Sequence, residues 1–269
     1  MKGAFIGDVV GSVYEWSGRR SRQFPLFGRH SRPTDDSLMT AAVALAFGTA
    51  REGRLEETEA VLAPLLCRFM RTIGRRYPHA GYGFRFKAWL FDDSQGPYQS
   101  FGNGAAMRVS PAGWYGRTLE EAEKLAVISA RVTHDEPSAE KAARAVAGGI
   151  FLARQGADRE KLRSYLKQYY PLETPLDVLQ REYVGDATCD GSVPQALEAF
   201  LEATDFEDAL RGAISLGGDS DTLAAIAGSL AEAFFGIPEA ILEAGEKRFL
   251  PEMWESLRQY ERISRKEEP

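Results

Sequence analysis

Apolar residues recur at helical spacing along almost the whole chain, and this pattern sets the expected fold class. The longest such segments cover residues 35–50, 55–73, 118–132, 137–155 and 220–235. Shorter helices are expected at 158–169, 175–183, 193–203 and 206–216. Alternating β-branched runs bounded by turns are scarce, so little strand is expected. The pattern therefore predicts an all-α protein.

Local signals mark several helix ends. Thr118 opens a capping-box pattern, and Asp205 is a candidate N-cap. Gly74 and Gly156 follow periodic segments, where glycine commonly ends a helix. The stretch 74–116, rich in glycine and aromatic residues, is the least regular part of the chain.

Composition supports one sizeable folded unit. Of 269 residues, 44% are hydrophobic and 27% are charged, which is typical of a globular protein with a real core. No linker, composition break or repeat of 20–50 residues divides the chain. We therefore expect residues 1–269 to form a single compact orthogonal multi-helix domain of about ten or more helices. No apolar stretch approaches the length of a membrane helix, so no membrane partner is expected.

The counts of charged residues, cysteine and histidine narrow the chemistry. Thirty-three basic against 39 acidic residues give a net charge of −6, which argues against a protein built mainly to grip nucleic acid or an anionic membrane. Two cysteines cannot form a disulfide scaffold and fit a reducing, cytoplasmic setting. With only three histidines as well, any bound metal is expected to have oxygen ligands.

Two acidic clusters each stand at the expected start of a helix. The first is Thr34-Asp35-Asp36-Ser37, and the second is Gly217-Gly218-Asp219-Ser220-Asp221-Thr222. Helix capping is one interpretation, because hydroxyls and carboxylates are favoured at helix N-termini. Metal binding is the other. If the fold unites the clusters, two carboxylates ~6 Å apart at an effective dielectric of ~20 repel by roughly 3 kcal/mol. Mg²⁺ or Mn²⁺ would remove that cost, and two such ions could share a carboxylate.

Two glycine-containing segments complete the set of motifs. GDVVGSVYE, residues 7–15, suggests close backbone packing and ends at Glu15, which could equally be an ordinary surface acid. SFGNGAAMR, residues 100–108, could expose backbone N–H groups to phosphate or simply form a tight turn. The second segment matches neither a Walker loop nor a Rossmann fingerprint.

Taken in order, these motifs resemble one enzyme family. GDVVGSVYE, TDDS, GNGAAMR, the THDEP of residues 133–137 and GGDSDT together are similar to the ADP-ribosylglycohydrolases, which include the dinitrogenase-reductase-activating and ADP-ribosylhydrolase enzymes. The resemblance covers about residues 1–236. It implies a compact all-α fold with two Mg²⁺ (or Mn²⁺) ions and, as substrate, the ADP-ribose moiety of a modified protein or small molecule. ADP-ribosylated nucleic acid is compatible with the same site.

The resemblance also implies roles for individual residues. The metal ligands would be Thr34, Asp35, Asp36, Asp219, Asp221 and Thr222. The substrate would contact Ser100, Phe101, Gly102, Asn103, Gly104, Met107, His134 and Ser220. For His134, a role as a cation at a helix C-terminus is the alternative. The catalytic residues would be Glu15, Asp35 and Asp36.

Cleavage at C1″ of the distal ribose would pass through an oxocarbenium-like state. Asp35 or Asp36 would orient or deprotonate the attacking water, and Glu15 would protonate the leaving group or guard the entrance. The segment SFGNGAAMR resembles more closely the branch of the family that acts on serine-linked or other O-linked ADP-ribose. Arginine-linked ADP-ribose is the alternative, for which Asp92 and Asp93 are the nearby acids.

Three points stay open. Arg19, Arg20, Arg22, Arg29 and Arg32 lie between Glu15 and Asp35 without an intervening acid. This loop could be a solvated basic segment or a rim that attracts an anionic target. A catalytically silent ADP-ribose-binding module and a Mg²⁺-dependent diphosphate enzyme of the terpene-synthase type are alternative functions. Against the latter, the acids here are adjacent instead of spaced at i and i+4.

Overall fold

Helices make up the architecture of this chain. The computed structural model describes residues 1–267, and within that range it contains fifteen helices and no strand beyond one isolated bridge between Gly102 and Thr188. The expected all-α class is confirmed. Positions 268 and 269 of the expected domain lie outside the described residues. Between residues 1 and 267, no helix is both long and apolar enough to cross a membrane.

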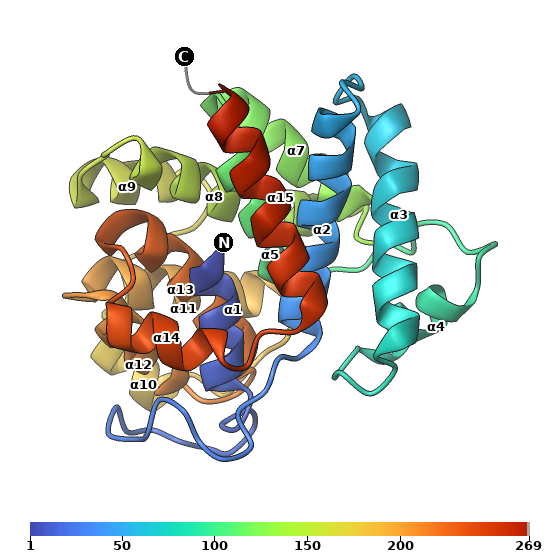
Figure 1. Ribbon diagram of the computed structural model, residues 1–269. Helices are drawn as coiled ribbons and strands as arrows, with labels where there is room; N and C mark the ends of the chain where they lie inside the picture. The colour runs from blue at the N-terminus through green and yellow to red at the C-terminus, as the bar shows by residue number, and fades with distance from the viewer. Residues whose placement is uncertain (268–269) are drawn as a thin grey trace.

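The helices follow one another as shown in Figure 1. They are α1 (Lys2–Gly11), α2 (Asp35–Glu52), α3 (Glu59–Arg76), α4 (Phe84–Phe91), α5 (Gly104–Met107), α6 (Ser110–Tyr115), α7 (Leu119–Arg131), α8 (Pro137–Arg154), α9 (Arg159–Leu166), α10 (Leu176–Glu182), α11 (Cys189–Glu202), α12 (Phe206–Ile214), α13 (Ser220–Phe235), α14 (Glu239–Glu246) and α15 (Pro251–Glu267).

Glycine brings α1 into backbone contact with α13. Gly3, Gly7 and Gly11 recur every four residues and therefore share one face of α1. A Cβ on Gly7 would lie 2.1 Å from the carbonyl oxygen of Ala224, and one on Gly3 would lie 2.2 Å from that of Gly228. The close packing suggested by these glycines is confirmed. It places the start of α13 beside the end of α1.

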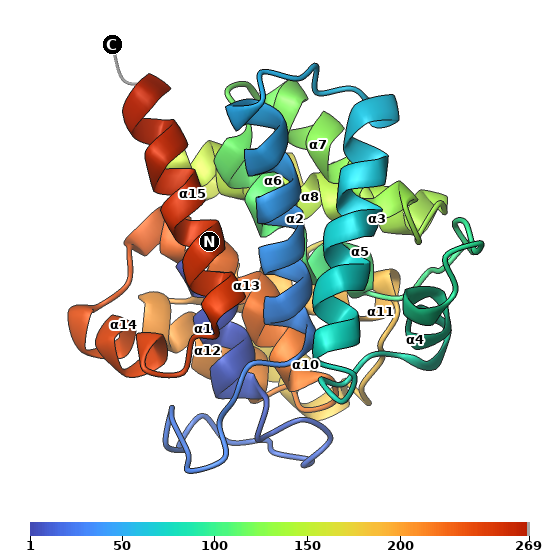
Figure 2. The same ribbon diagram turned by 45° about the vertical axis from the view of Figure 1, so that its right-hand side comes forward.

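Small residues also let the other central helices pack closely. In α2 and α13, alanine occupies many of the fully buried positions, such as Ala41 and Ala42 in the one and Ala224 and Ala227 in the other. Figure 2 shows α2 between α3 and α15, and α2 packs against both of these helices. At the N-termini of these two helices, Asp36 and Asp221 are buried, whereas Asp35 and Asp219 are partly exposed.

Several helix boundaries differ from the sequence expectation. α3 begins at Glu59 instead of residue 55 and continues through Gly74 to Arg76. Gly74 serves close packing there and not helix termination, since a Cβ would lie 2.6 Å from the Leu90 side chain. α11 begins at Cys189, four residues earlier than expected, because the Thr188 side chain accepts a hydrogen bond from the Gly191 amide.

Helices also occur where none was expected. The glycine-rich α1 was not predicted, and the irregular stretch 74–116 contains α4, α5 and α6. The predicted caps are confirmed. Thr118 accepts from the Glu121 amide at 3.1 Å, Asp205 accepts from the Asp208 amide at 2.8 Å, and Gly156 has a φ of 77° just after α8.

Candidate metal centre and its cavity

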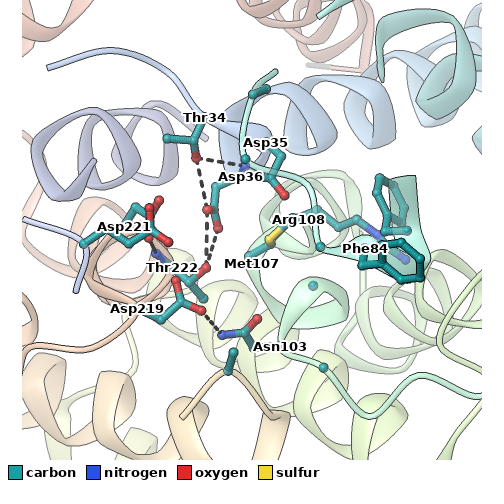
Figure 3. Close-up of a pocket in the computed structure, with 18 of the residues that line it drawn as sticks. Thr34, Asp35, Asp36, Phe84, Asn103, Met107, Arg108, Asp219, Asp221 and Thr222 are labelled. Carbon is teal, nitrogen blue, oxygen red and sulfur yellow. Dashed lines mark hydrogen bonds between the residues drawn. The ribbon is translucent and has the colours of Figure 1, made fainter. Parts of the chain in front are cut away.

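The N-termini of α2 and α13 meet, and the two acidic clusters face each other (Figure 3). The hydroxyl Oγ1 of Thr222 donates to Oδ1 of Asp36 at 2.9 Å. Thr34 Oγ1 lies 3.3 Å from Oδ2 of the same Asp36 carboxylate. The fold therefore unites side chains that are separated by most of the chain.

Asp8 of α1 lies beneath this junction and was not predicted as part of it. It is fully buried, and its carboxylate accepts hydrogen bonds from the amide and hydroxyl of Thr34 at 2.9 and 2.6 Å. It also accepts from the amide of Ser37 at 3.1 Å and from the Ser37 hydroxyl. Asp8 thus holds the first turn of α2 in place. The sequence did contain a signal for a buried role of Asp8. It is a lone acid in an apolar, glycine-rich segment, and a buried acid needs hydrogen-bond donors around it.

Two groups of three carboxylates could each hold a cation. Asp8, Asp36 and Asp221 form one group, and Glu15, Asp219 and Asp221 form the other. In each group, one oxygen atom per residue lies within 4.8 Å of the others. Asp221 belongs to both groups. Asp35 belongs to neither but lines the same cavity.

The electrostatics of the cluster disfavour full ionisation. Burial, followed by the charge of Asp8, raises the pKa of Asp35 to about 8. Burial and neighbouring carboxylates also raise the pKa values of Asp36 and Asp221 well above the usual range. Burial raises the pKa of Asp8 to about 6, although its hydrogen bonds from Ser37 and Thr34 oppose the shift. A bound cation would reverse these shifts, because it favours the ionised carboxylates.

Helix capping explains the first cluster only in part and does not explain the second. Thr34 does cap α2, since its side chain accepts from the Asp36 amide. Asp219 stands at the N-cap of α13 but makes no side-chain cap bond. Its carboxylate accepts from Nδ2 of Asn103 at 2.7 Å instead. Asp219 is therefore directed toward the glycine-containing segment, as Figure 3 shows.

A cavity of about 460 Å³ opens in front of the cluster. Six of the expected substrate-contacting residues line it, namely Ser100, Gly102, Asn103, Gly104, Met107 and His134. The other two are placed elsewhere. Phe101 is 57% exposed and is not among the lining residues. Ser220 is buried, and its hydroxyl donates to the carbonyl of Gly11 at 3.1 Å.

The wall of the cavity around His134 carries two arginines and a tyrosine, of which only Arg108 lies in a segment singled out from the sequence. Arg85 lies over the ring of Tyr98, at 4.8 Å from its centroid, and both residues line the cavity. Arg108 is fully buried there, and burial lowers its pKa to about 10. The cavity therefore has an acidic end and a basic end. For Arg85 and Tyr98, the only sequence signal was the aromatic content of the stretch 74–116.

The glycine-containing segment is held by the chain that leads into α11. The amide of Asn103 donates to the carbonyl of Ala187 at 2.9 Å, and the amide of Cys189 donates to that of Phe101 at 2.9 Å. The Gly102 amide donates to the Ser100 hydroxyl at 3.2 Å. Two of the backbone donors expected to face phosphate are thus already used within the protein. Cys189 is fully buried in this contact.

Glu15 lies at the exposed rim of the cavity, beside Trp16. The indole Nε1 of Trp16 donates to Oε1 of Glu15 at 2.9 Å. Trp16 has a φ of 51°, an uncommon conformation for a non-glycine residue, and its amide donates to the carbonyl of Gly218 at 2.8 Å. Partial burial, followed by the charge of Asp219, raises the pKa of Glu15.

Several arginines of the loop between Glu15 and Asp35 bind other parts of the protein. Arg20 donates to the carbonyl of Tyr183 at 2.6 Å and to that of Leu216. Arg22 pairs with Asp208 at 2.9 Å. Arg19 lies over the rings of Tyr14 and Phe24. These contacts attach three arginines to the protein, although Arg20 stays exposed, whereas Arg32 is exposed and lines the cavity.

Comparison with known proteins shows the family to which this chain belongs. A sequence model of the family described as ADP-ribosylglycohydrolase matches residues 1–267. The chain is 26% identical to ADP-ribosylhydrolase ARH3 of Mus musculus, over 95% of this chain and 85% of the relative. It is 29% identical to ADP-ribosylarginine hydrolase Tri1 of Pseudomonas putida, over 87% of this chain and 69% of the relative.

Two further matches concern an archaeal protein and a solved structure. An uncharacterised protein of Archaeoglobus fulgidus is 35% identical over 56% of this chain, and the match spans about half (55%) of that relative. A solved structure titled as an ADP-ribosylglycohydrolase-related protein complex matches with a TM-score of 0.63 and 26% identity, over 98% of this chain and 97% of that one.

Proposed function

The chain belongs to the ADP-ribosylglycohydrolase family, and from that premise we propose that it is a metal-dependent hydrolase that releases ADP-ribose from an ADP-ribosylated acceptor. The observation that carries the proposal is the two-ended cavity. Carboxylates gather at one end, and Arg85, Arg108 and His134 lie at the other. ADP-ribose has the matching polarity, with a hydroxyl-rich ribose beyond an anionic diphosphate.

The acidic end suits two Mg²⁺ ions, with Mn²⁺ as the alternative. The proposed ligands are Thr34, Asp35, Asp36, Asp219, Asp221 and Thr222. All of them offer oxygen atoms, which these hard cations prefer. When all are ionised, Asp8 and the five acids noted in the sequence carry a formal charge of −6, against +4 from two ions. When bound, the ions would offset most of this charge, polarise ribose hydroxyls and lower the pKa of water.

The carboxylates and Thr34 have separate tasks in this proposal. Asp35 and Asp36 orient the attacking water and take its proton. Thr34 gives its own hydroxyl hydrogen to Asp8 and accepts from the Asp36 amide, which leaves one lone pair of its oxygen for a cation. Glu15 is placed to protonate the leaving acceptor atom, since it lies at the rim and its raised pKa favours a proton donor. Cleavage of the bond at C1″ then proceeds through an oxocarbenium-like state.

The basic end would bind the diphosphate. Arg85 and Arg108 raise the electrostatic potential there, and His134 faces Gly104 of the glycine-containing segment. Ser100, Gly102, Asn103 and Met107 line the adjacent wall. Phe101 and Ser220, also proposed from the sequence, would act from outside this wall, Phe101 at the surface and Ser220 through the Gly11 carbonyl.

We favour serine-linked or other O-linked ADP-ribose as the substrate linkage. An arginine acceptor calls for an acid near the leaving guanidinium. Asp93 pairs with Arg75 instead, and Asp92 accepts from Ser94, and neither acid lines the cavity. Glu15 does lie at the rim of the cavity, but the proposed mechanism uses it as the proton donor. The acceptor can be a protein, a small molecule or a nucleic acid.

The decisive experiment measures free ADP-ribose released from serine-, arginine- and acetyl-linked substrates, with Mg²⁺ and after its removal by a chelator. We expect release that requires the cation and is fastest from an O-linked substrate. Faster release from the arginine linkage would overturn the assignment of linkage but not that of the reaction. No release from any substrate, together with calorimetric binding of ADP-ribose, would instead establish a silent binding module.

A further inference from the structure

His134 follows α7 and places its ring against the glycine-containing segment. The ring is 4% exposed and lines the cavity. A Cβ on Gly104 would lie 3.1 Å from Nε2, so that nitrogen faces the segment at close range. The other nitrogen, Nδ1, lies 2.7 Å from the hydroxyl Oγ1 of Thr133. Which nitrogen carries the proton decides whether His134 offers a donor or an acceptor to the cavity.

Arg108 determines the direction of the hydrogen bonds around Thr133. Its Nη2 donates to Oγ1 of Thr133 at 2.8 Å and to the carbonyl of Ser129 at 2.9 Å. A guanidinium has donors and no acceptor, so the Thr133 oxygen must accept in this pair. Arg108 and Thr133 are both fully buried, which keeps water from replacing either partner.

Among residues 1–267, the single hydroxyl hydrogen of Thr133 then has one acceptor within reach, Nδ1 of His134. If Nδ1 carried a hydrogen instead, the Thr133 hydroxyl hydrogen would be buried without an acceptor, which is unfavourable. The consistent arrangement runs from Arg108 through Thr133 to Nδ1. It leaves the one ring hydrogen of a neutral imidazole on Nε2.

We propose that Arg108 and Thr133 are positioning residues that hold His134 as its neutral Nε2–H tautomer, a fixed hydrogen-bond donor beside the glycine-containing segment. The use of that donor rests on the proposed function, in which an oxygen of the substrate diphosphate accepts from Nε2. The tautomer itself does not depend on the reaction.

The charges around the ring oppose its protonation. Arg108 lies on the Thr133 side, and Arg85 lies over Tyr98, whose ring centroid is 5.9 Å from that of His134. Burial, followed by the charges of Arg108 and Arg85, lowers the pKa of His134 well below 6.5. A cationic histidine would therefore not replace the neutral donor at neutral pH.

The tautomer can be measured directly by ¹⁵N NMR of the imidazole nitrogens in the wild-type protein. The chain has three histidines, and the spectrum of His134→Gln identifies the signals of His134 by their loss. We expect a protonated, pyrrole-like Nε2 and an unprotonated, pyridine-like Nδ1. The opposite pattern, or two protonated nitrogens at pH 7.5, would overturn the proposal without any reference to activity.

Thr133→Val tests the relay, and Thr133→Ser is the matched control because it keeps the hydroxyl. Valine should release Nδ1 and give a mixture of tautomers, whereas serine should retain the wild-type spectrum. With Mg²⁺ present, Thr133→Val should weaken ADP-ribose binding about tenfold, the effect of one hydrogen bond to an anion, and serine should restore it. An unchanged tautomer in Thr133→Val would overturn the relay.

The binding experiment separates the relay from the proposed function. A changed tautomer with wild-type ADP-ribose affinity would contradict the use of Nε2 as a substrate donor. If the wild-type protein failed to bind ADP-ribose at all, the proposed function would fail while the measured tautomer still decided the relay.

Discussion

Thr222 donates a hydrogen bond to Asp36 over 2.9 Å, although 186 positions separate the two residues in the chain. This bond joins the N-terminus of α13 to that of α2, where the two acidic clusters lie. Asp36 is buried and receives no basic partner in this bond, only a hydroxyl. Burial and the neighbouring carboxylates therefore keep the pKa of Asp36 well above its usual range until a cation binds.

Asp221→Asn should separate the destabilising effect of the carboxylate cluster on the fold from its contribution to Mg²⁺ binding. Asp221 belongs to both carboxylate groups, and burial, followed by the charges of Asp36 and Asp219, raises its pKa. Removing one like charge should raise the unfolding free energy of the metal-free protein by ~1–3 kcal/mol. It should also weaken Mg²⁺ binding by at least about tenfold. Denaturation with and without Mg²⁺, and titration calorimetry, measure the two effects.

Asp93→Asn is the control for that variant. Asp93 is exposed, pairs with Arg75 and lies outside the cavity, so its loss should leave Mg²⁺ affinity unchanged. A wild-type Mg²⁺ affinity in Asp221→Asn would contradict the proposed ligand set.

Gly7→Ala should destabilise the fold through the contact between α1 and α13. The added Cβ would meet the carbonyl oxygen of Ala224 at 2.1 Å, and backbone on both sides leaves no flexible side chain to yield. We expect a loss of about 2–3 kcal/mol in urea denaturation. Gly96→Ala, where a Cβ meets nothing within 4 Å, should be neutral or slightly stabilising. Equal stabilities for the two variants would show that α1 can shift along α13.

His134 should make the stability of the protein depend on pH near neutrality. Its pKa in the folded state is lowered by burial and then by Arg108 and Arg85, so the unfolded chain takes up the proton first. The stabilisation is therefore complete above pH 6.5 and is lost as the pH falls. Wild type should lose up to roughly 1.4 kcal/mol per pH unit below 6.5 relative to His134→Gln. Parallel curves for the two proteins between pH 5 and 8 would refute this assignment.

Substitutions of two arginines of the same loop should differ in their effect on the salt dependence of KM. Arg32 is exposed and lines the cavity, whereas Arg20 binds the carbonyls of Tyr183 and Leu216. If Arg32 attracts an anionic substrate, Arg32→Ala should reduce the salt dependence of KM, because screening then has less to remove. Arg20→Ala should keep the wild-type salt dependence but unfold at lower denaturant concentration. Identical salt slopes for Arg32→Ala and wild type would dismiss a steering role.

Helical periodicity and the helix caps were readable from the sequence because both depend on neighbours three or four residues apart. The all-α class, the start of α13 at Ser220 and the caps at Thr118 and Asp205 follow from such local patterns. The helices of the stretch 74–116 were not readable, because they are short and their stability comes from packing, as the Gly74–Leu90 contact shows. The expected metal ligands were likewise selected by residue type at two helix starts.

What only the tertiary structure decided is how distant side chains meet. The glycine face of α1 sets the separation of α1 and α13, and through it places Asp8 beneath Thr34 and beside Asp221. No local pattern encodes such a distance, since it depends on the sum of packing contacts along two helices. The same holds for Arg20, Arg22 and Asp93, whose charges are directed to partners within the protein and away from the cavity. Residue type identified the chemistry of this chain, and packing selected which residues can carry it out.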